Sequence, residues 1–307
     1  MPLVSIIIPN YNHASFLQQR IESVLGQTFR DFEVLLLDDA STDNSAAVLK
    51  SYESHEKVTQ VFVNASNSGS PFGLWKQGLE MAKGSLVWIA ESDDWVEPNF
   101  LERLVPKMED PNVVVGHCKS YNATGEKEYF NPWWDSFGTG FWKEDYCKEG
   151  TELLQFYGKY RCPVMNVSSA LVRKESIDLA WFPIRYRYCG DWWFWMMLFL
   201  KGKVAFCAEP MNYIRVHKQS AIRSQKKSSL PRLRENVEVI KDIHIGLQEN
   251  LAYSEQYDWL IDHWVEEMFR EGKYFNPSYH KTRLPKTFRS PFYKAYRKQL
   301  KIKLAKK

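Results

Sequence analysis

The chain has 307 residues, and 44% of them are hydrophobic, which is enough for one large folded domain and excludes wholesale disorder. The net charge of +4 is unevenly placed, because residues 272–307 hold 12 basic residues and no acidic one. The first 271 residues hold the other 29 basic residues against all 37 acidic ones. An acidic body of this kind argues against a nucleic-acid-binding protein.

The five cysteines have no C-x-x-C spacing, which argues against a zinc site and indicates a reducing compartment. The N-terminal segment lacks the basic start and apolar length of a signal peptide. No window reaches the roughly 18 apolar residues that a spanning helix needs. These features predict a cytoplasmic protein.

The first half of the chain alternates between short apolar runs and segments with helical spacing. The strand-like runs are 4–9, 32–39, 58–64 and 85–90. The helical segments between them are 15–27, 41–54 and 72–84. This alternation predicts an α/β fold with a Rossmann-like, mostly parallel central sheet and helices on both faces.

The second half is less regular. Residues 119–165 are rich in aromatic residues and Gly, and we expect loops and short elements there. The further expected elements are a strand at 166–174, an apolar helix at 191–202, one or two strands at 204–217, and charged helices at 230–251 and 254–272. We therefore expect a main domain over 1–223, with halves at about 1–100 and 101–223, and a helical C-terminal region with a basic tail over 224–307.

Polar residues gather where the apolar runs end. They are Asn10 and Asn12, then Asp38 and Asp39, and then Glu91, Asp93 and Asp94. In open α/β sheets, ligands bind outside the carboxyl ends of the strands, so these groups are expected at one edge. Three carboxylates within four residues repel one another, so they form either a solvated turn or a metal site. Their place at the end of a buried strand favours the metal, and hard cations such as Mg²⁺ prefer oxygen ligands.

Several stretches of the sequence together resemble a known family. "VSIIIPNYNHASFLQQRIESVLGQTFRDFEVLLLDDASTDNS" and "AKGSLVWIAESDDWVEP" look like the start of an inverting family 2 glycosyltransferase with a GT-A fold. The resemblance returns at "GDWWFW" and "YIRVHKQS". It implies transfer from a nucleotide-diphosphate sugar, with UDP expected, and Mg²⁺ or Mn²⁺ as cofactor. It also implies a glycan or lipid-linked acceptor and a role in bacterial surface polysaccharide synthesis.

The resemblance implies a nucleotide-sugar site built from the loops after the first strands. Its expected residues are Pro9, Tyr11, Asn12, Asp38, Asp39, Asn67, Lys76, Asp93 and Arg215. Asp39 is the expected contact to the base, although a helix cap is the alternative for both members of the Asp38–Asp39 pair. The family's usual Arg-Asn is replaced here by "WKQ", so Lys76 is a departure from the pattern.

The expected metal ligands are Asp94, Asp93 and His217. Asp93 is assigned to ribose or metal, and Glu91 stands where the family often has Asp. His217 and Arg215 lie in the "YIRVHKQS" stretch, where the resemblance implies contacts to metal or diphosphate; a structural His is the alternative.

Asp191 is the expected catalytic base that deprotonates the acceptor hydroxyl, with helix capping as the alternative. Gly190 stands where the family often has an acidic residue. One direct displacement at the anomeric carbon would invert its configuration. A nucleotidyltransferase is disfavoured because "PNYNHASF" has no Gly-rich loop. A nucleotide-sugar-binding protein without transferase activity stays open, and would be favoured if Asp191 lay remote from the metal residues.

The basic tail, residues 281–307, has 11 basic and no acidic residues with aromatic and aliphatic residues between them. This composition predicts peripheral contact with an anionic membrane, at the inner face of the cell membrane. A solvated tail is the alternative.

Overall fold

The computed structural model describes residues 1–125, 127–130, 140–183, 185–217, 230–273 and 284–305. Over these residues, none of the helices combines the length and the apolar composition needed to cross a membrane.

The N-terminal part of the sheet is parallel. Strand β1 (Val4–Asn10) lies between β2 (Phe32–Asp38) and β4 (Leu86–Ile89), and β3 (Val58–Val63) extends the sheet beyond β2. Every residue of β1, β2 and β4 is buried, as expected for strands covered on both faces. The continuous apolar runs in the sequence therefore predicted these strands correctly.

The rest of the sheet is mixed. Beyond β4 come β9 (Ala170–Arg173), β6 (Val113–Thr124), β10 (Lys203–Arg215) and β5 (Trp95–Val96). The short strands β7 (Lys127–Tyr129) and β8 (Tyr146–Glu149) pair with β6 and β10. Because β9 is antiparallel to both β4 and β6, and β10 is parallel to β6, strand β10 runs in the same direction as β1 and β4.

Helices cover both faces of the sheet, which confirms the α/β prediction. Helices α1 (Ala14–Leu25), α2 (Ser45–Ser51) and α4 (Phe100–Leu104) share one core with Ile6 and Ile8 of β1. Helices α3 (Pro71–Met81) and α6 (Gly190–Phe199) share the other core with Ile7. Alternate residues of one strand thus serve opposite cores, as the period of two in a strand requires.

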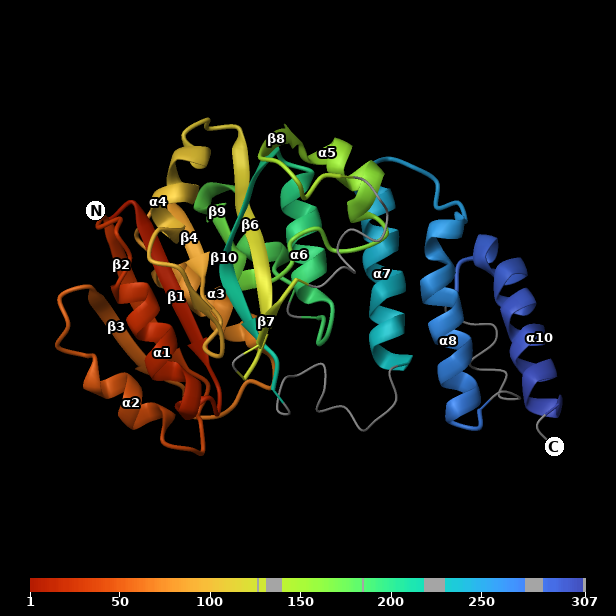
Figure 1. Ribbon diagram of the computed structural model, residues 1–307, viewed down its shortest axis with the longest axis horizontal. Helices are drawn as coiled ribbons and strands as arrows, with labels where there is room; N and C mark the ends of the chain where they lie inside the picture. The colour runs from red at the N-terminus through yellow and green to blue at the C-terminus, as the bar shows by residue number, and fades with distance from the viewer. Residues whose placement is uncertain (126, 131–139, 184, 218–229, 274–283, 306–307) are drawn as a thin grey trace.

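The C-terminal helices extend the second core away from the sheet. Helix α7 (Leu230–Gly246) packs on α6, α8 (Asp258–Arg270) packs on α7, and α10 (Arg289–Ala305) packs on α8. They stand in a row beside the sheet, with α10 outermost (Figure 1). Their buried apolar residues belong to the same cluster as those of α6, and the short helix α5 (Gly150–Leu153) also contributes.

Two expectations differ from the structure. Strand β6 lies outside all the strands expected from the sequence, and its second half, to Thr124, occupies part of the stretch expected to hold loops and short elements. Its first six residues are all buried, so they show no alternation. Strand β9 begins at Ala170, since residues 167–169 form a short 3-10 turn.

Candidate active site

The carboxylate of Asp38 joins the ends of β1 and β2. It is fully buried and accepts hydrogen bonds from Asn10 Nδ2 at 2.6 Å, from Ser41 Oγ at 2.6 Å and from the Ser41 backbone N–H at 2.8 Å. Asn10 and Asp38 are register partners at the last position of the two parallel strands. Asp38 therefore fixes the loops at this edge of the sheet.

The carboxylate of Asp39 is held by the loop after β3. Its oxygens accept from Asn64 Nδ2 at 2.7 Å, from the Ser68 N–H at 3.0 Å and from Ser68 Oγ at 2.8 Å. Asn67 Nδ2 donates to the Asp39 carbonyl oxygen at 3.2 Å. An ionised carboxylate has about four acceptor positions, so this loop uses most of the capacity of Asp39.

Asn12 shapes the loop after β1. It adopts a left-handed backbone conformation, with φ of 57°, and its Oδ1 accepts from the Thr42 N–H at 2.7 Å. Tyr11 beside it is 44% exposed, whereas Pro9 is buried within β1. Lys76 lies on α3 and pairs with Glu80 at 4.0 Å, one helical turn away. The loops of β1 and β2 are thus tied together, with Tyr11 at their surface.

The three carboxylates after β4 have different partners. Asp94 is buried and accepts from Ser168 Oγ at 2.8 Å and from the Arg215 N–H at 3.1 Å. Glu91 accepts from Trp75 Nε1 at 3.2 Å. Asp93 is the one paired with His217, whose Nε2 lies 3.0 Å from Asp93 Oδ2.

This acidic turn is electrostatically strained. Burial, together with the charges of Asp93 and Asp94, raises the pKa of Glu91 to about 8. Burial and the charge of Asp93 also raise the pKa of Asp94. Arg20, on α1, is fully buried beside the turn and opposes this repulsion. Burial lowers the pKa of Arg20 to about 10, so it stays cationic at neutral pH.

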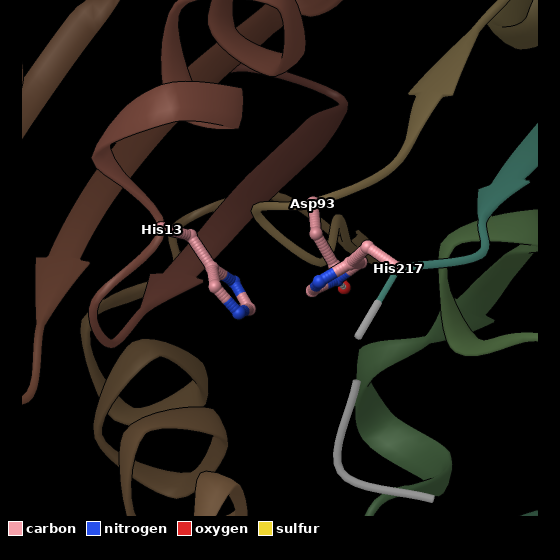
Figure 2. Close-up of side chains that lie close together, drawn as sticks. All are labelled: His13, Asp93 and His217. Atoms are coloured by element: carbon pink, nitrogen blue, oxygen red, sulfur yellow. Dashed lines mark hydrogen bonds and ion pairs between the residues drawn. The ribbon is translucent and has the colours of Figure 1, made fainter. Parts of the chain in front are cut away.

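His13, Asp93 and His217 form a cluster that could hold a metal ion (Figure 2). One ligand atom from each lies within 4.8 Å of those of the other two. They follow β1, β4 and β10, which run in the same direction, so their loops meet at one edge of the sheet. Of the expected metal ligands, the cluster contains Asp93 and His217 and does not include Asp94, and it adds His13.

The donor set of this cluster fits a transition metal. Two imidazoles and one carboxylate suit Mn²⁺ and similar ions, whereas Mg²⁺ prefers oxygen ligands alone. Burial lowers the pKa of His13, although Asp93 opposes the shift, which favours the neutral imidazole that a metal requires. His13 Nδ1 also lies 2.8 Å from Ser92 Oγ, which orients the ring. Sequence reasoning missed His13, although its position directly after the first strand was the available signal.

Arg215 anchors the acidic turn from β10. Its Nε donates to the Asp93 carbonyl oxygen at 2.8 Å, and a terminal nitrogen donates to Gln19. Its guanidinium lies 4.6 Å from the ring centre of Trp95 and 4.8 Å from that of Phe16. These contacts fix the guanidinium next to the cluster of His13, Asp93 and His217.

Asp191 lies in the first turn of α6. Its Oδ1 accepts from the Trp192 N–H at 2.7 Å, and burial raises the pKa of its carboxyl group. A Cβ added to Gly190 would lie 2.5 Å from the Phe72 ring, so any side chain at this position would require Phe72 to shift. Across the described ranges, no hydrogen bond links Asp191 to the cluster of His13, Asp93 and His217.

The turn before Asp191 is held by α7. Glu235 accepts from the N–H groups of Arg187 at 3.0 Å, Tyr188 at 2.7 Å and Cys189 at 2.9 Å. Three backbone donors on one carboxylate make a strong anchor for this turn. Glu235 was not among the residues singled out in the sequence.

The family model described as "Glycosyl transferase family 2" matches residues 5–179. The chain belongs to glycosyl transferase family 2. Among curated relatives, it is similar to "Glycosyltransferase GlyG" of Streptococcus pneumoniae serotype 4, with 26% identity over 73% of this chain and 74% of that protein. It is also 29% identical, over 38% of each chain, to a Campylobacter jejuni enzyme named "GalNAc(5)-diNAcBac-PP-undecaprenol beta-1,3-glucosyltransferase".

Solved structures of glycosyltransferases share the fold of this family 2 chain. S. aureus TarS 1–349 in complex with UDP-GlcNAc has a TM-score of 0.64 at 19% identity, covering 95% of this chain and 79% of that one. The mannosyltransferase PcManGT from Pyrobaculum calidifontis, in complex with GDP-Man and Mn²⁺, has a TM-score of 0.60 at 16% identity. The match covers 91% of this chain and 72% of that one. These likenesses confirm the predicted GT-A type of fold.

Proposed function

We propose that this family 2 glycosyltransferase transfers a sugar from a UDP-linked donor to a hydroxyl group of a glycan or lipid-linked acceptor, with inversion. The observation that carries the proposal is the meeting of His13, Asp93 and His217 at the carboxyl edge of the sheet. The Campylobacter jejuni relative is named for an acceptor linked to undecaprenol, which supports a lipid-linked acceptor and, with it, a role in bacterial surface polysaccharide synthesis. The UDP-GlcNAc complex of a protein with the same fold supports the choice of donor class.

The proposed metal site consists of Asp93, His217 and His13. Their mixed nitrogen and oxygen donors favour Mn²⁺ over Mg²⁺. The metal would neutralise the negative charge that develops on the departing diphosphate. Asp94 was expected to be a ligand, but its bonds to Ser168 and to the Arg215 backbone suit it better to positioning the turn.

The proposed nucleotide site lies between the loops after β1, β2 and β3. Asp39 keeps its expected role at the base, because its carboxylate has about four acceptor positions and receives three donors from Asn64 and Ser68. The other proposed contacts are Pro9, Tyr11, Asn12, Asp38, Asn67, Lys76 and Arg215. Tyr11 is well exposed and can pack on the base. Asp38 is buried, so its proposed role is to position Asn10 and Ser41, which donate to its carboxylate.

Asp191 is the proposed base. A carboxyl group whose pKa is raised by burial is a better proton acceptor than a solvated one, provided that it is ionised when the acceptor hydroxyl approaches. The proton moves from that hydroxyl to a carboxylate oxygen of Asp191 as the hydroxyl attacks the anomeric carbon. A single displacement from the side opposite the leaving diphosphate gives inversion.

A panel of nucleotide sugars, each with Mn²⁺, with Mg²⁺ or with a chelator, tests the proposal by thermal shift. We expect one UDP-sugar to raise the melting temperature in the presence of Mn²⁺, followed by release of UDP when acceptor extracts are added. Metal-independent shifts would contradict the metal site. Donor binding without UDP release under any acceptor condition would favour a binding protein without transferase activity.

A further inference from the structure

Helix α10 is docked on the protein by its apolar side. Phe292 is fully buried in the large core, and Tyr296 and Ala295 pack against that core from the same side of the helix. The Tyr296 ring lies 5.3 Å from the ring of Phe269 on α8. This packing fixes which side of α10 faces outward.

The outward side of α10 is basic. The helix carries six basic residues and no acidic one. Four of the six recur at spacings of three and four residues, and they line one surface together with Ser290 and Tyr293: Lys294, Arg297, Lys298 and Lys301. These four cations are all exposed. We call this surface the basic face.

No residue in the described part of the chain neutralises these four cations by an ion pair. Helix α8, on which α10 packs, carries the exposed acids Asp262 and Glu266, yet neither is paired with α10. Among the described residues, the basic face is therefore not the counterpart of an acidic surface. Its charge is available to an external partner.

Apolar side chains accompany the charge. Tyr293 is 37% exposed, Ile302 is 43% exposed and Leu304 is 62% exposed. A helix that exposes both basic and apolar groups suits the interface of a bilayer, where cations meet anionic headgroups and apolar groups leave water. A nucleic-acid backbone would attract the same cations but would offer little to Ile302 and Leu304.

The position of α10 makes its outward side accessible. It is the last helix of the row α6, α7, α8 and α10, at the end of the molecule away from the parallel strands (Figure 1). A flat surface can therefore approach α10 without covering the loops at the ends of β1 and β4.

We infer that the basic face of α10 docks the protein on an anionic lipid bilayer. Each Lys or Arg near such a surface adds attraction, and salt screens it over about 8 Å at physiological ionic strength. The exposed apolar residues supply a second, salt-insensitive contribution. The inference rests on α10 alone and holds whether or not the proposed sugar transfer is correct.

Vesicle flotation of the full chain tests this inference. We expect binding to vesicles that contain phosphatidylglycerol, no binding to pure phosphatidylcholine vesicles, and weaker binding as salt is raised. The variant R297Q/K298Q/K301Q should lose at least about tenfold in partitioning. A control with the same net charge, K50Q/K83Q/K143Q, removes exposed cations on other elements and should bind like the parent chain.

A second variant separates the two contributions. I302S/L304S should weaken binding at high salt, where the charge attraction is screened, more than at low salt. Equal partitioning of the basic-face variant and its charge-matched control would overturn the inference. So would tight binding to a poly(U) RNA together with no binding to the anionic vesicles.

Discussion

Arg20 of α1 donates its Nε–H to the backbone carbonyl oxygen of Glu91 at 2.8 Å. The arginine is fully buried, and its two terminal nitrogens have no hydrogen-bond partner in the part of the chain that the structure describes. Its charge interacts with Glu91, Asp93 and Asp94. A buried cation thus lies beside the acidic turn that carries Asp93.

Replacing Arg20 with Met should strongly destabilise the protein. Removing one partner of a buried charge group typically costs about 3–5 kcal/mol, because the remaining charges lose their compensation. Urea unfolding at neutral pH measures the loss. The matched control is Arg30→Met, since Arg30 is exposed just after the same helix and should change stability little. A loss no larger than that of the control would show that Arg20 does not balance the acidic turn.

The stability of the metal-free protein should fall as pH rises from about 4.5 to about 8. The pKa of Glu91 is raised from 4.5 to about 8 in the folded state, so its ionised form opposes folding. The stabilisation from protonated Glu91 is complete below the unfolded pKa and is lost as pH passes through the folded pKa.

Glu91→Gln should remove much of this dependence and raise the free energy of unfolding at pH 8, by up to about 3 kcal/mol. The amide oxygen can still accept from Trp75 Nε1. Glu80→Gln, at a surface position, serves as control. The measurement is urea unfolding across this pH range in the presence of a chelator. A pH profile that Glu91→Gln leaves unchanged would contradict the assignment.

His13→Ala should weaken Mn²⁺-dependent binding of UDP by at least about tenfold, since even a group that only orients a metal ligand contributes this much. Calorimetry with UDP, with and without Mn²⁺, measures the change. His263→Ala removes an exposed histidine on α8 and should have no effect. If His13→Ala binds UDP and Mn²⁺ as the parent does, the metal is held without His13.

Asp93→Asn and Asp94→Asn should affect different properties of the protein, namely UDP binding and stability. The first should abolish metal-dependent UDP binding while it leaves unfolding nearly unchanged, because Asp93 is partly exposed and pairs with His217. The second should lower stability by about 1–3 kcal/mol, because an amide cannot accept from both Ser168 and Arg215 as a carboxylate does. Calorimetry and urea unfolding on both variants decide between them. The reverse pattern would restore Asp94 as the metal ligand.

Glu235→Gln should lower kcat and leave UDP binding intact. The amide loses one acceptor oxygen for the N–H groups of Arg187, Tyr188 and Cys189, so the turn before Asp191 becomes less fixed. With the donor found in the nucleotide-sugar panel, we expect a fall in kcat of about tenfold or more. Glu238→Gln, on the exposed side of the same helix, is the control. A parallel loss of UDP affinity would indicate general damage to the fold instead of misplacement of Asp191.

The parallel half of the sheet was predictable because its residues carry the information locally. Strands buried on both faces must be continuously apolar, and the runs at β1, β2 and β4 are. A site that includes both Asp93 and His217 was expected only from the resemblance of "YIRVHKQS" to the family's pattern, and the structure places the two side chains 3.0 Å apart. The whole of strand β6 was missed, because a strand with polar residues on covered faces has no clear period.

Arg20 shows what local pattern reading leaves out. It occupies the buried stripe of α1 with Leu17, Ile21 and Val24, at the spacing that normally holds apolar residues. The position of Arg20 in this stripe can be recognised from the sequence. What stabilises a charged residue there is its contact with Glu91, in a turn 71 residues away. The anchoring of residues 187–189 by Glu235 is likewise a contact between distant segments. Neither contact has a sequence motif of its own.

The two cores on opposite faces of the sheet would be completed at very different times during synthesis. In the core beneath α1, α2 and α4, the last buried residue along the sequence is Met211. In the core around α6, the last one is Phe292. A nascent chain that has just emerged past β10 can therefore close one side of its sheet while Trp193 still lacks Asp242 of α7, to which its Nε1 donates. Chaperones that recognise exposed apolar surface would find this side open until α7 and α8 leave the ribosome.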